Sequence, residues 1–147
     1  MPDILKELCA KFPSRARIFT LAWQAHQRAE YELSVPICLA QADGICRDLT
    51  SYQLFRKRQG LPQIASYVAS LPADRFTTAL LEPLTVVLPI SASADQRSRD
   101  SKELNRHSVL HGESVDYGTE INSLKSISLL QYVSSVLERP SKRADAA

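Results

Sequence analysis

Apolar residues recur at intervals of three and four over most of the chain, and this spacing puts them on one face of an α-helix. The clearest run lies at 35–52 and consists of Val35, Cys38, Leu39, Ala42, Ile45, Cys46, Leu49 and Tyr52. Ser34 before the run is a typical N-cap residue, and Pro36 suits the first turn of a helix. We therefore predict a central core helix that begins at Ser34.

Proline, glycine and short polar residues divide the rest of the chain into further segments with helical spacing. These segments are residues 3–12, 14–29, 63–68, 74–81 and 119–137. The apolar residues at 85–88 have strand composition but no partner strand elsewhere in the sequence, so a broken helix fits this stretch better. The polar stretch 91–101 predicts a loop. The pattern as a whole predicts an all-α fold.

The composition agrees with one helical domain. The chain has 147 residues, of which 44% are hydrophobic, and this is enough to bury a core of its own. We predict a single domain at 1–139 and a disordered tail at 140–147. The net charge of +2, from 18 basic and 16 acidic residues, neither indicates nor excludes a nucleic-acid partner.

Cysteine usage and hydropathy predict a soluble protein of the cytoplasm. Cys9, Cys38 and Cys46 are odd in number, and the two helical turns between Cys38 and Cys46 would hold these two about 12 Å apart, too far for a disulfide. Free thiols suit a reducing compartment. The first residues lack the pattern of a signal peptide, and no apolar run reaches the length of about 18 residues that spans a membrane, so no membrane partner is predicted.

The densest cluster of chemistry-bearing side chains lies at 104–112, where Arg106, His107 and His111 precede Gly112. Glycine stops a helix by adopting the left-handed conformation, so His111 is predicted in the last helical turn. Unpaired carbonyl groups at a helix end favour a protonated imidazole by several tenths of a kcal/mol up to about 2 kcal/mol. His111 is therefore expected to carry a proton near neutral pH.

Other catalytic and ligand-binding motifs are absent from the sequence. His107 and His111 have the i, i+4 spacing of a zinc-binding pair, but no glutamate follows the first histidine as it does in metalloproteases. There is no Cys-x-x-Cys pair, glycine-rich phosphate loop or Gly-x-Ser-x-Gly nucleophile motif. We therefore predict neither a bound metal nor a cofactor.

One pattern in the cluster at 104–112 resembles the R-x4-6-H motif of HEPN domains, a family of small helical bundles. Arg106 is followed by a polar residue, and His111 comes after four intervening positions. The order of elements agrees, because this family carries its motif at the end of a helix just before the last long helix, and 104–112 precedes the helix predicted at 119–137. The resemblance covers most of residues 14–139 in helix order. It implies an antiparallel bundle of about four to six helices.

Many HEPN domains are metal-independent ribonucleases of bacterial defence, toxin–antitoxin and stress systems, so the resemblance implies an endoribonuclease. In that chemistry a 2′-hydroxyl attacks the adjacent phosphate; His111 would move a proton, and Arg106 would stabilise the phosphate charge. The resemblance further implies that Asn105, His107 and Tyr117 contact the substrate. RNA, a second copy of the chain and an antitoxin protein are the partners it implies.

The homodimer is also expected from the residues themselves. On an ideal helix Arg106 and His111 lie about 140° apart, so one chain alone does not bring them together. The helix predicted at 119–137 has an unusually wide apolar face, which is typical of a helix that is central to its own bundle or shared with a second chain. A symmetric pair would present two arginines and two histidines across one cleft.

Two other interpretations stay open. In one, the chain is a non-catalytic helical module that binds RNA or a nucleotide, or interacts with a protein, through the same residues. In the other, Arg106 pairs with a carboxylate while the histidines cap the helix or pack. The basic residues at 56–58 likewise predict either a solvated helix end or, if the chain binds RNA, contacts to phosphate. Arg97 and Arg99 either reach a bound anion or belong to a solvated loop.

Overall fold

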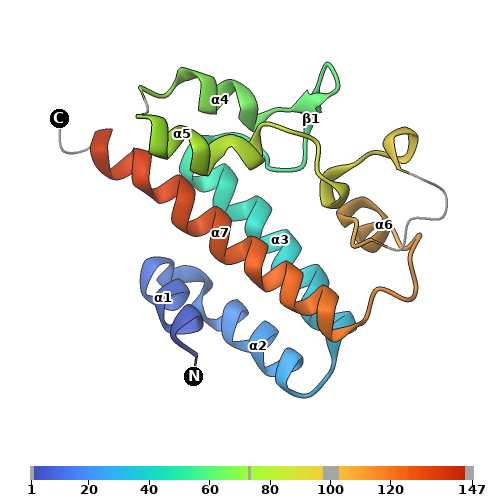
Figure 1. Ribbon diagram of the computed structural model, residues 1–147. Coiled ribbons are helices and arrows are strands. Elements are labelled where there is room, and N and C mark those ends of the chain that lie inside the picture. Colours follow the sequence, from blue (N-terminus) through green and yellow to red (C-terminus); the bar gives the residue numbers. More distant parts are fainter. Residues whose placement is uncertain (1, 73, 98–102, 145–147) are drawn as a thin grey trace.

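The computed structural model describes residues 2–72, 74–97 and 103–144, which form a bundle of helices with one small hairpin (Figure 1). Seven α-helices lie within these ranges, so the predicted all-α class is confirmed. They are α1 (Asp3–Lys11), α2 (Ala16–Gln27), α3 (Tyr31–Thr50), α4 (Ile64–Ser70), α5 (Arg75–Leu81), α6 (Arg106–Leu110) and α7 (Glu120–Ala144). Among the described residues, no helix is both long and apolar enough to cross a membrane.

Short turns and a hairpin connect these helices. The 3-10 turns are η1 (Pro13–Arg15), η2 (Glu82–Leu84), η3 (Pro89–Ser91) and η4 (Ala94–Gln96). Strand β1 (Lys57–Arg58) pairs antiparallel with β2 (Leu61–Pro62). Residues 85–88 form no strand, as predicted, but they are not helical either: the chain leaves α5 through η2, and 85–88 follow as a turn and a bend before η3.

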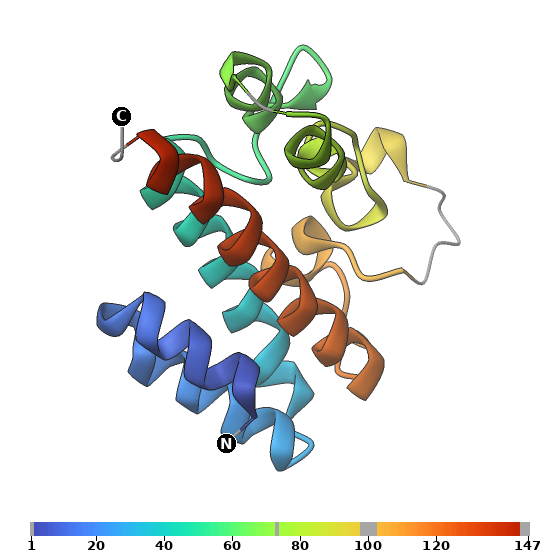
Figure 2. The ribbon, with the colours of Figure 1, turned by 60° about the vertical axis from the view of Figure 1, so that its left-hand side comes forward.

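Helices α3 and α7 form the centre of the bundle and run in the same direction (Figures 1 and 2). Their contacts advance together along both helices: the hydroxyl oxygens of Ser34 and Ser123 are 2.6 Å apart, and the side chains of Cys38 and Ser126, about one turn further along each helix, lie next to each other. The predicted antiparallel arrangement is therefore wrong for this pair. A short loop would have made the two helices antiparallel, whereas residues 51–119 return the chain to the end where α3 began.

The other helices flank this pair on two sides. Helices α1 and α2 lie on one side, and α4, α5 and α6 lie on the other (Figure 2). Buried apolar side chains from both sides meet the central pair in one core; they include Leu8, Phe19, Ile45, Leu81, Val133 and Leu137. A second, smaller core attaches α6 to α3 and consists of Val35, Leu39, Leu104 and Val109. Burial of each large side chain contributes about 1.5–3 kcal/mol to stability.

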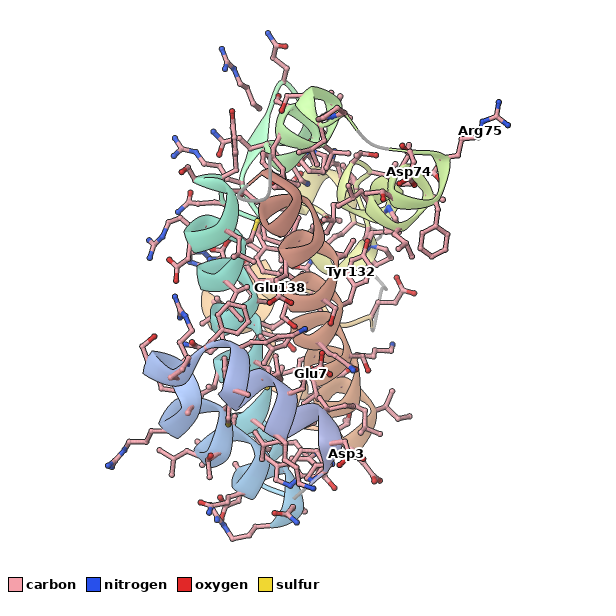
Figure 3. All side chains as sticks on the ribbon, turned by 90° about the vertical axis from the view of Figure 1, so that its left-hand side faces the viewer. Asp3, Glu7, Asp74, Arg75, Tyr132 and Glu138 are labelled. Atoms are coloured by element: carbon pink, nitrogen blue, oxygen red, sulfur yellow. The ribbon has the colours of Figure 1, made fainter. Side chains whose placement is uncertain are left out.

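Polar contacts from α7 fix helices on both sides (Figure 3). Lys11 Nζ lies 2.7 Å from Glu7 Oε1 and 3.0 Å from Glu138 Oε2, which joins α1 to α7. On the other side the Tyr132 hydroxyl donates a 2.6 Å hydrogen bond to the carbonyl oxygen of Leu80 in α5. Helix α7 is thus the element to which both flanking layers are attached.

The central helix begins earlier than the sequence predicts. Helix α3 starts at Tyr31, so Ser34 and Pro36 lie inside it and the predicted cap at Ser34 is wrong. Pro36 has no N–H to donate to the carbonyl of Glu32, one turn earlier. The Tyr117 hydroxyl, 3.0 Å from that carbonyl oxygen, takes the place of the missing donor.

Other helix ends follow the sequence in part. Asp74 caps α5 by accepting a 2.8 Å hydrogen bond from the N–H of Thr77, as predicted. The basic residues at 56–58 do not close a helix, because α3 ends before them and they lead into the hairpin. Helix α7 includes residues 140–144, where the sequence predicts a tail, and residues 145–147 lie outside the described part of the chain.

The cysteines are free thiols, as predicted. Cys38 and Cys46 are buried, and burial raises the pKa of each thiol to about 11. Cys9 is half-buried. Because the thiolate is the reactive form, the two buried cysteines behave as small apolar core residues.

Replacing Tyr132 by phenylalanine tests the contact between α7 and α5. The variant loses one hydrogen bond, so its free energy of unfolding at neutral pH is expected to fall by about 1 kcal/mol. Burial raises the pKa of the Tyr132 hydroxyl to about 12, so the folded chain favours the neutral phenol. This contribution to stability is complete below about pH 10, the usual value for an unfolded tyrosine, and is lost as the pH rises through the raised pKa.

Urea denaturation of the parent and the Tyr132→Phe variant measures both effects. The difference in their free energies of unfolding should be constant below about pH 10 and shrink above it. Tyr31→Phe is the control at neutral pH, because the Tyr31 hydroxyl makes no hydrogen bond with another described residue. A difference that stayed constant at alkaline pH would contradict the assignment.

Candidate functional site

Helix α6 carries the Arg-His motif and has a defined start and end. Asn105 caps it by accepting a 3.1 Å hydrogen bond from the N–H of Ser108 through Oδ1. At the other end Gly112 has a φ of 72°, and its N–H donates to the carbonyl of Val109. A left-handed glycine that satisfies a terminal carbonyl ends the helix. The predicted stop is confirmed, and His111 is the residue just before it.

Asn105 is one of the residues predicted to contact substrate, and the structure gives its amide internal partners. Its Nδ2 donates to the carbonyl oxygens of Pro89, at 2.8 Å, and Ala92, at 2.9 Å. An asparagine amide has two N–H donors, so both are used. Only 5% of the residue is exposed. Asn105 therefore fixes α6 to the η3 turn and has no donor left for a ligand.

Arg106 lies over an aromatic ring. Its Cζ is 5.5 Å from the ring centroid of Phe55, which is a cation–π geometry. Its Nε is buried without a hydrogen-bond partner, and its guanidinium forms no ion pair with any carboxylate of the described residues. The interpretation in which Arg106 pairs with a carboxylate therefore finds no support in these residues.

His107 and His111 lie side by side at the end of α6. Their ring centroids are 4.2 Å apart. His107 Nε2 is also 3.1 Å from Glu113 Oε1, so this carboxylate holds the ring in place, while His111 is exposed. No hydrogen bond or ring contact joins Arg106 to either histidine within the described residues. The structure brings the two histidines together and leaves the arginine apart from them.

Glu113 connects His107 to a second arginine. Its Oε2 accepts hydrogen bonds from Arg97 Nη2, at 3.1 Å, and from the Ser108 hydroxyl, at 3.2 Å, and Arg97 also donates to Ser108 Oγ. The hydrogen bond from Arg97 lowers the pKa of Glu113, and burial opposes this only in part. Arg97 is thus occupied by internal partners and would have to leave them to bind an anion. Arg99 lies outside the described residues.

Tyr117, also predicted as a substrate contact, has structural partners. Its hydroxyl donates to the carbonyl of Glu32 in α3, and its ring packs against the second core. Its own carbonyl accepts a 3.0 Å hydrogen bond from Asn122 Nδ2 in α7. Tyr117 therefore joins the loop after α6 to both central helices.

A cleft of about 980 Å³ opens beside α6, between η3, η4 and the start of α7. Its polar lining residues include Arg97, Asn105, Ser108, Glu113, Asp116, Asn122 and Lys125. Tyr117 also lines it, whereas Arg106, His107 and His111 do not. The residues predicted for the site are thus divided: Asn105 and Tyr117 support the wall of the cleft, and the motif residues lie outside it.

Comparisons of the chain with models of protein families, with curated proteins and with solved structures found no match. The resemblance to HEPN domains stays a prediction that rests on the motif and on the order of the helices. In the ranges that the structure describes, no group of three or more His, Cys, Asp or Glu side chains is placed to hold a metal ion.

Phe55 and Glu113 belong to the site but were not expected from the sequence. Glu113 had a local signal, because a carboxylate two residues after His111 is close enough to reach back to the histidines. Phe55 had none, because it lies far from Arg106 in the sequence and only the fold brings the two together.

The positioning role of Asn105 can be tested by Asn105→Ala. The variant removes the helix cap and leaves two carbonyl groups without their donor, so its free energy of unfolding is expected to fall by about 3 kcal/mol. Thr119→Ala is the matched control: Thr119 caps α7 by accepting a 3.2 Å hydrogen bond from the N–H of Asn122 at an exposed position. The Thr119→Ala variant should lose about 1 kcal/mol of its free energy of unfolding. Equal losses in urea denaturation would show that the amide of Asn105 does not hold α6.

Proposed function

We propose that the chain is a metal-independent endoribonuclease whose site is built on Arg106, His107 and His111 of α6. The observation that carries the proposal is the charge of Arg106, which lies against Phe55 and has no carboxylate partner among the described residues. A guanidinium in this state keeps the donors of its two terminal nitrogens available for a phosphate. The ring also limits the orientations of the guanidinium, which reduces the entropy lost on binding.

The two histidines are the groups that transfer or direct protons. His111 is exposed, its ring touches that of His107, and Glu113 holds His107 at Nε2. A base whose ring is oriented by a neighbouring group is a common arrangement in acid–base catalysis. We assign proton transfer to His111 and a positioning role to His107.

The reaction would be transesterification of RNA. A base removes the proton of a 2′-hydroxyl, the freed oxygen attacks the adjacent phosphorus, and the bond from phosphorus to the next 5′-oxygen breaks as that oxygen takes a proton. The products are a 2′,3′-cyclic phosphate and a 5′-hydroxyl. Arg106 would stabilise the charge that develops on the phosphate oxygens.

A second copy of the chain would complete this site. Within one chain Arg106 lies against Phe55 while His111 faces solvent, and the two do not touch. Large apolar side chains are exposed on α6, on the loop after it and at the start of α7: Leu110, Val115, Ile121 and Leu124. A symmetric pair that buries them would bring Arg106 close to the partner's His111. In a bacterial defence, toxin–antitoxin or stress system, an antitoxin protein would cover the same face.

The alternative is a non-catalytic helical module that binds RNA or a nucleotide through Arg106 or docks a protein. The separation of Arg106 from His111 within one chain favours this alternative if the chain stays monomeric. Cleavage and assembly therefore decide between the two functions.

Incubation of the purified chain with RNA in EDTA tests the chemistry. We expect cleavage that leaves 2′,3′-cyclic phosphate ends, because the proposed groups need no metal. Arg106→Ala and His111→Ala should each lower the rate by roughly 10² or more, the usual scale for loss of a charge-stabilising or acid–base group. His107→Ala should cost less. Arg75→Ala is the control, because Arg75 is exposed on α5 and points into solvent (Figure 3).

Thermal melts of the same variants separate catalysis from folding. His111 is exposed, so its variant should melt within a few degrees of the parent. If the His111→Ala variant cleaved RNA at the full rate, or if it unfolded, the catalytic role of His111 would be contradicted. The non-catalytic binding module would then be the better interpretation.

Light scattering tests the homodimer. At micromolar concentration we expect a mass of two chains of 16.4 kDa. Ile121→Glu with Leu124→Glu should return the mass of one chain and lower cleavage, because two carboxylates would be buried at the interface. Phe76→Glu is the control, since Phe76 is as exposed an apolar residue, at 67%, but lies on α5. A parent that is monomeric at every concentration would contradict the prediction.

A further inference from the structure

The hairpin of β1 and β2 has one face packed on the protein and one face exposed. Side chains alternate between the two faces along a strand. Burial alternates through β1 and the two residues before it: Phe55 and Lys57 are partly buried, and Arg56 and Arg58 are exposed. The pairing continues beyond β1 to Arg56, whose carbonyl oxygen accepts a 2.7 Å hydrogen bond from the N–H of Gln63. The three basic residues are therefore not equivalent: one cation points inward and two point outward.

The inner face attaches the hairpin to the candidate site. Lys57 Nζ lies 3.4 Å from Ser93 Oγ and donates to Gln96 Oε1, which joins β1 to the η4 segment. The ring of Phe55 lies beneath the guanidinium of Arg106. Contacts on both sides of Arg56 thus determine which way the outer face points.

The turn of the hairpin gives Arg58 a defined support. Arg58 pairs with Leu61, and Gln59 and Gly60 between them have φ angles of 53° and 81°. Positive φ at both positions is the type I′ geometry, whose twist matches that of the paired strands. Gly60 adopts it without the steric cost that a side chain would add. Arg58 is therefore presented by a short, regular turn.

Neither Arg56 nor Arg58 forms an ion pair with a carboxylate in the described part of the chain. By contrast, Arg15, Arg28 and Arg97 each have a guanidinium nitrogen 2.6–3.1 Å from a carboxylate oxygen. An arginine without such a partner can offer its planar donors to a phosphate. The outer face of the hairpin thus has the chemistry of a phosphate-binding surface.

We propose that Arg56 and Arg58 bind neighbouring backbone phosphates of a single RNA strand that leads to Arg106. This inference rests on the proposed function, because it gives the path of the RNA on which α6 acts. Residues two apart in an extended chain have Cα atoms about 7 Å apart, which suits adjacent phosphates of one RNA strand. Phe55, beneath Arg106, is at most about 10 Å of extended chain from Arg58, so one short stretch of RNA reaches all three arginines.

Binding of a fluorescent 2′-O-methyl RNA of about 12 nucleotides tests this path, because the oligonucleotide keeps its phosphates but has no attacking hydroxyl. Anisotropy titrations of the full chain at several salt concentrations give the affinity and its salt dependence. Arg56→Gln with Arg58→Gln should weaken binding about tenfold and reduce the slope of log K against log salt by about 1.4, roughly 0.7 for each lost phosphate contact. Arg47→Gln with Arg75→Gln removes the same charge from exposed positions elsewhere and should leave the slope unchanged.

Lysine replacements show whether charge or local structure is responsible. Arg56→Lys with Arg58→Lys should keep the parent slope, since ammonium groups also contact phosphate. An unchanged slope in the glutamine variant, or no binding by the parent, would overturn the inference, and an acidic protein would then be the partner that fits the hairpin. The inference is supported if the slope of log K against log salt falls in the Arg56→Gln, Arg58→Gln variant and in none of the others. This holds even if the parent binds RNA without cutting it, because failure to cut refutes the nuclease and leaves the RNA path standing.

Discussion

Two fully buried hydroxyl groups, those of Ser34 and Ser123, set the arrangement of the bundle. Each residue is 0% exposed, their oxygens are 2.6 Å apart, and His26 Nδ1 lies 2.9 Å from Ser123 Oγ. A buried hydroxyl that loses its partner costs about 1–3 kcal/mol. Sliding α3 along α7 by one turn would break this contact, so the hydrogen bond favours one register of the parallel pair. Apolar packing alone would specify that register less strictly.

The register of the central pair determines where the motif helix can lie. It brings the loop before α7 to the start of α3, where Pro36 leaves the carbonyl of Glu32 without an N–H donor and Tyr117 supplies one. Gly118 packs so closely on Glu32 that a Cβ there would overlap its carboxylate. The loop between α6 and α7 is therefore fixed by an irregularity in a core helix, and α6 is placed by contacts that its own sequence does not contain.

Rules that act within one helical turn account for what the sequence predicted correctly, such as the amphipathic segments and the stop at Gly112. The start of α3 was misplaced because Pro36 lies inside the helix, where Tyr117, which is distant in the sequence, supplies a donor to the carbonyl of Glu32. In the site, the short motif helix was predictable, whereas the ring under Arg106 comes from Phe55, and a strand of two residues is too short to be predicted from a sequence pattern. Local patterns predict elements; tertiary contacts decide which side chains stay available to a ligand.

The net charge of +2 does not show that Arg97 and Arg106 differ in whether a carboxylate already pairs with them. Arg97 lies against Glu113, and the hydrogen bond between them lowers the pKa of that carboxyl group. Because the pKa of Glu113 is lowered, the contact contributes its full stability at any pH above the usual pKa of a carboxyl group. This contribution is lost only as the pH falls through the lowered pKa. Arg97 therefore stays in the wall of the cleft near neutral pH, while Arg106 has no carboxylate to leave among the described residues. Affinity for an anion is thus determined by which cations are already paired, and total charge is a poor guide to it.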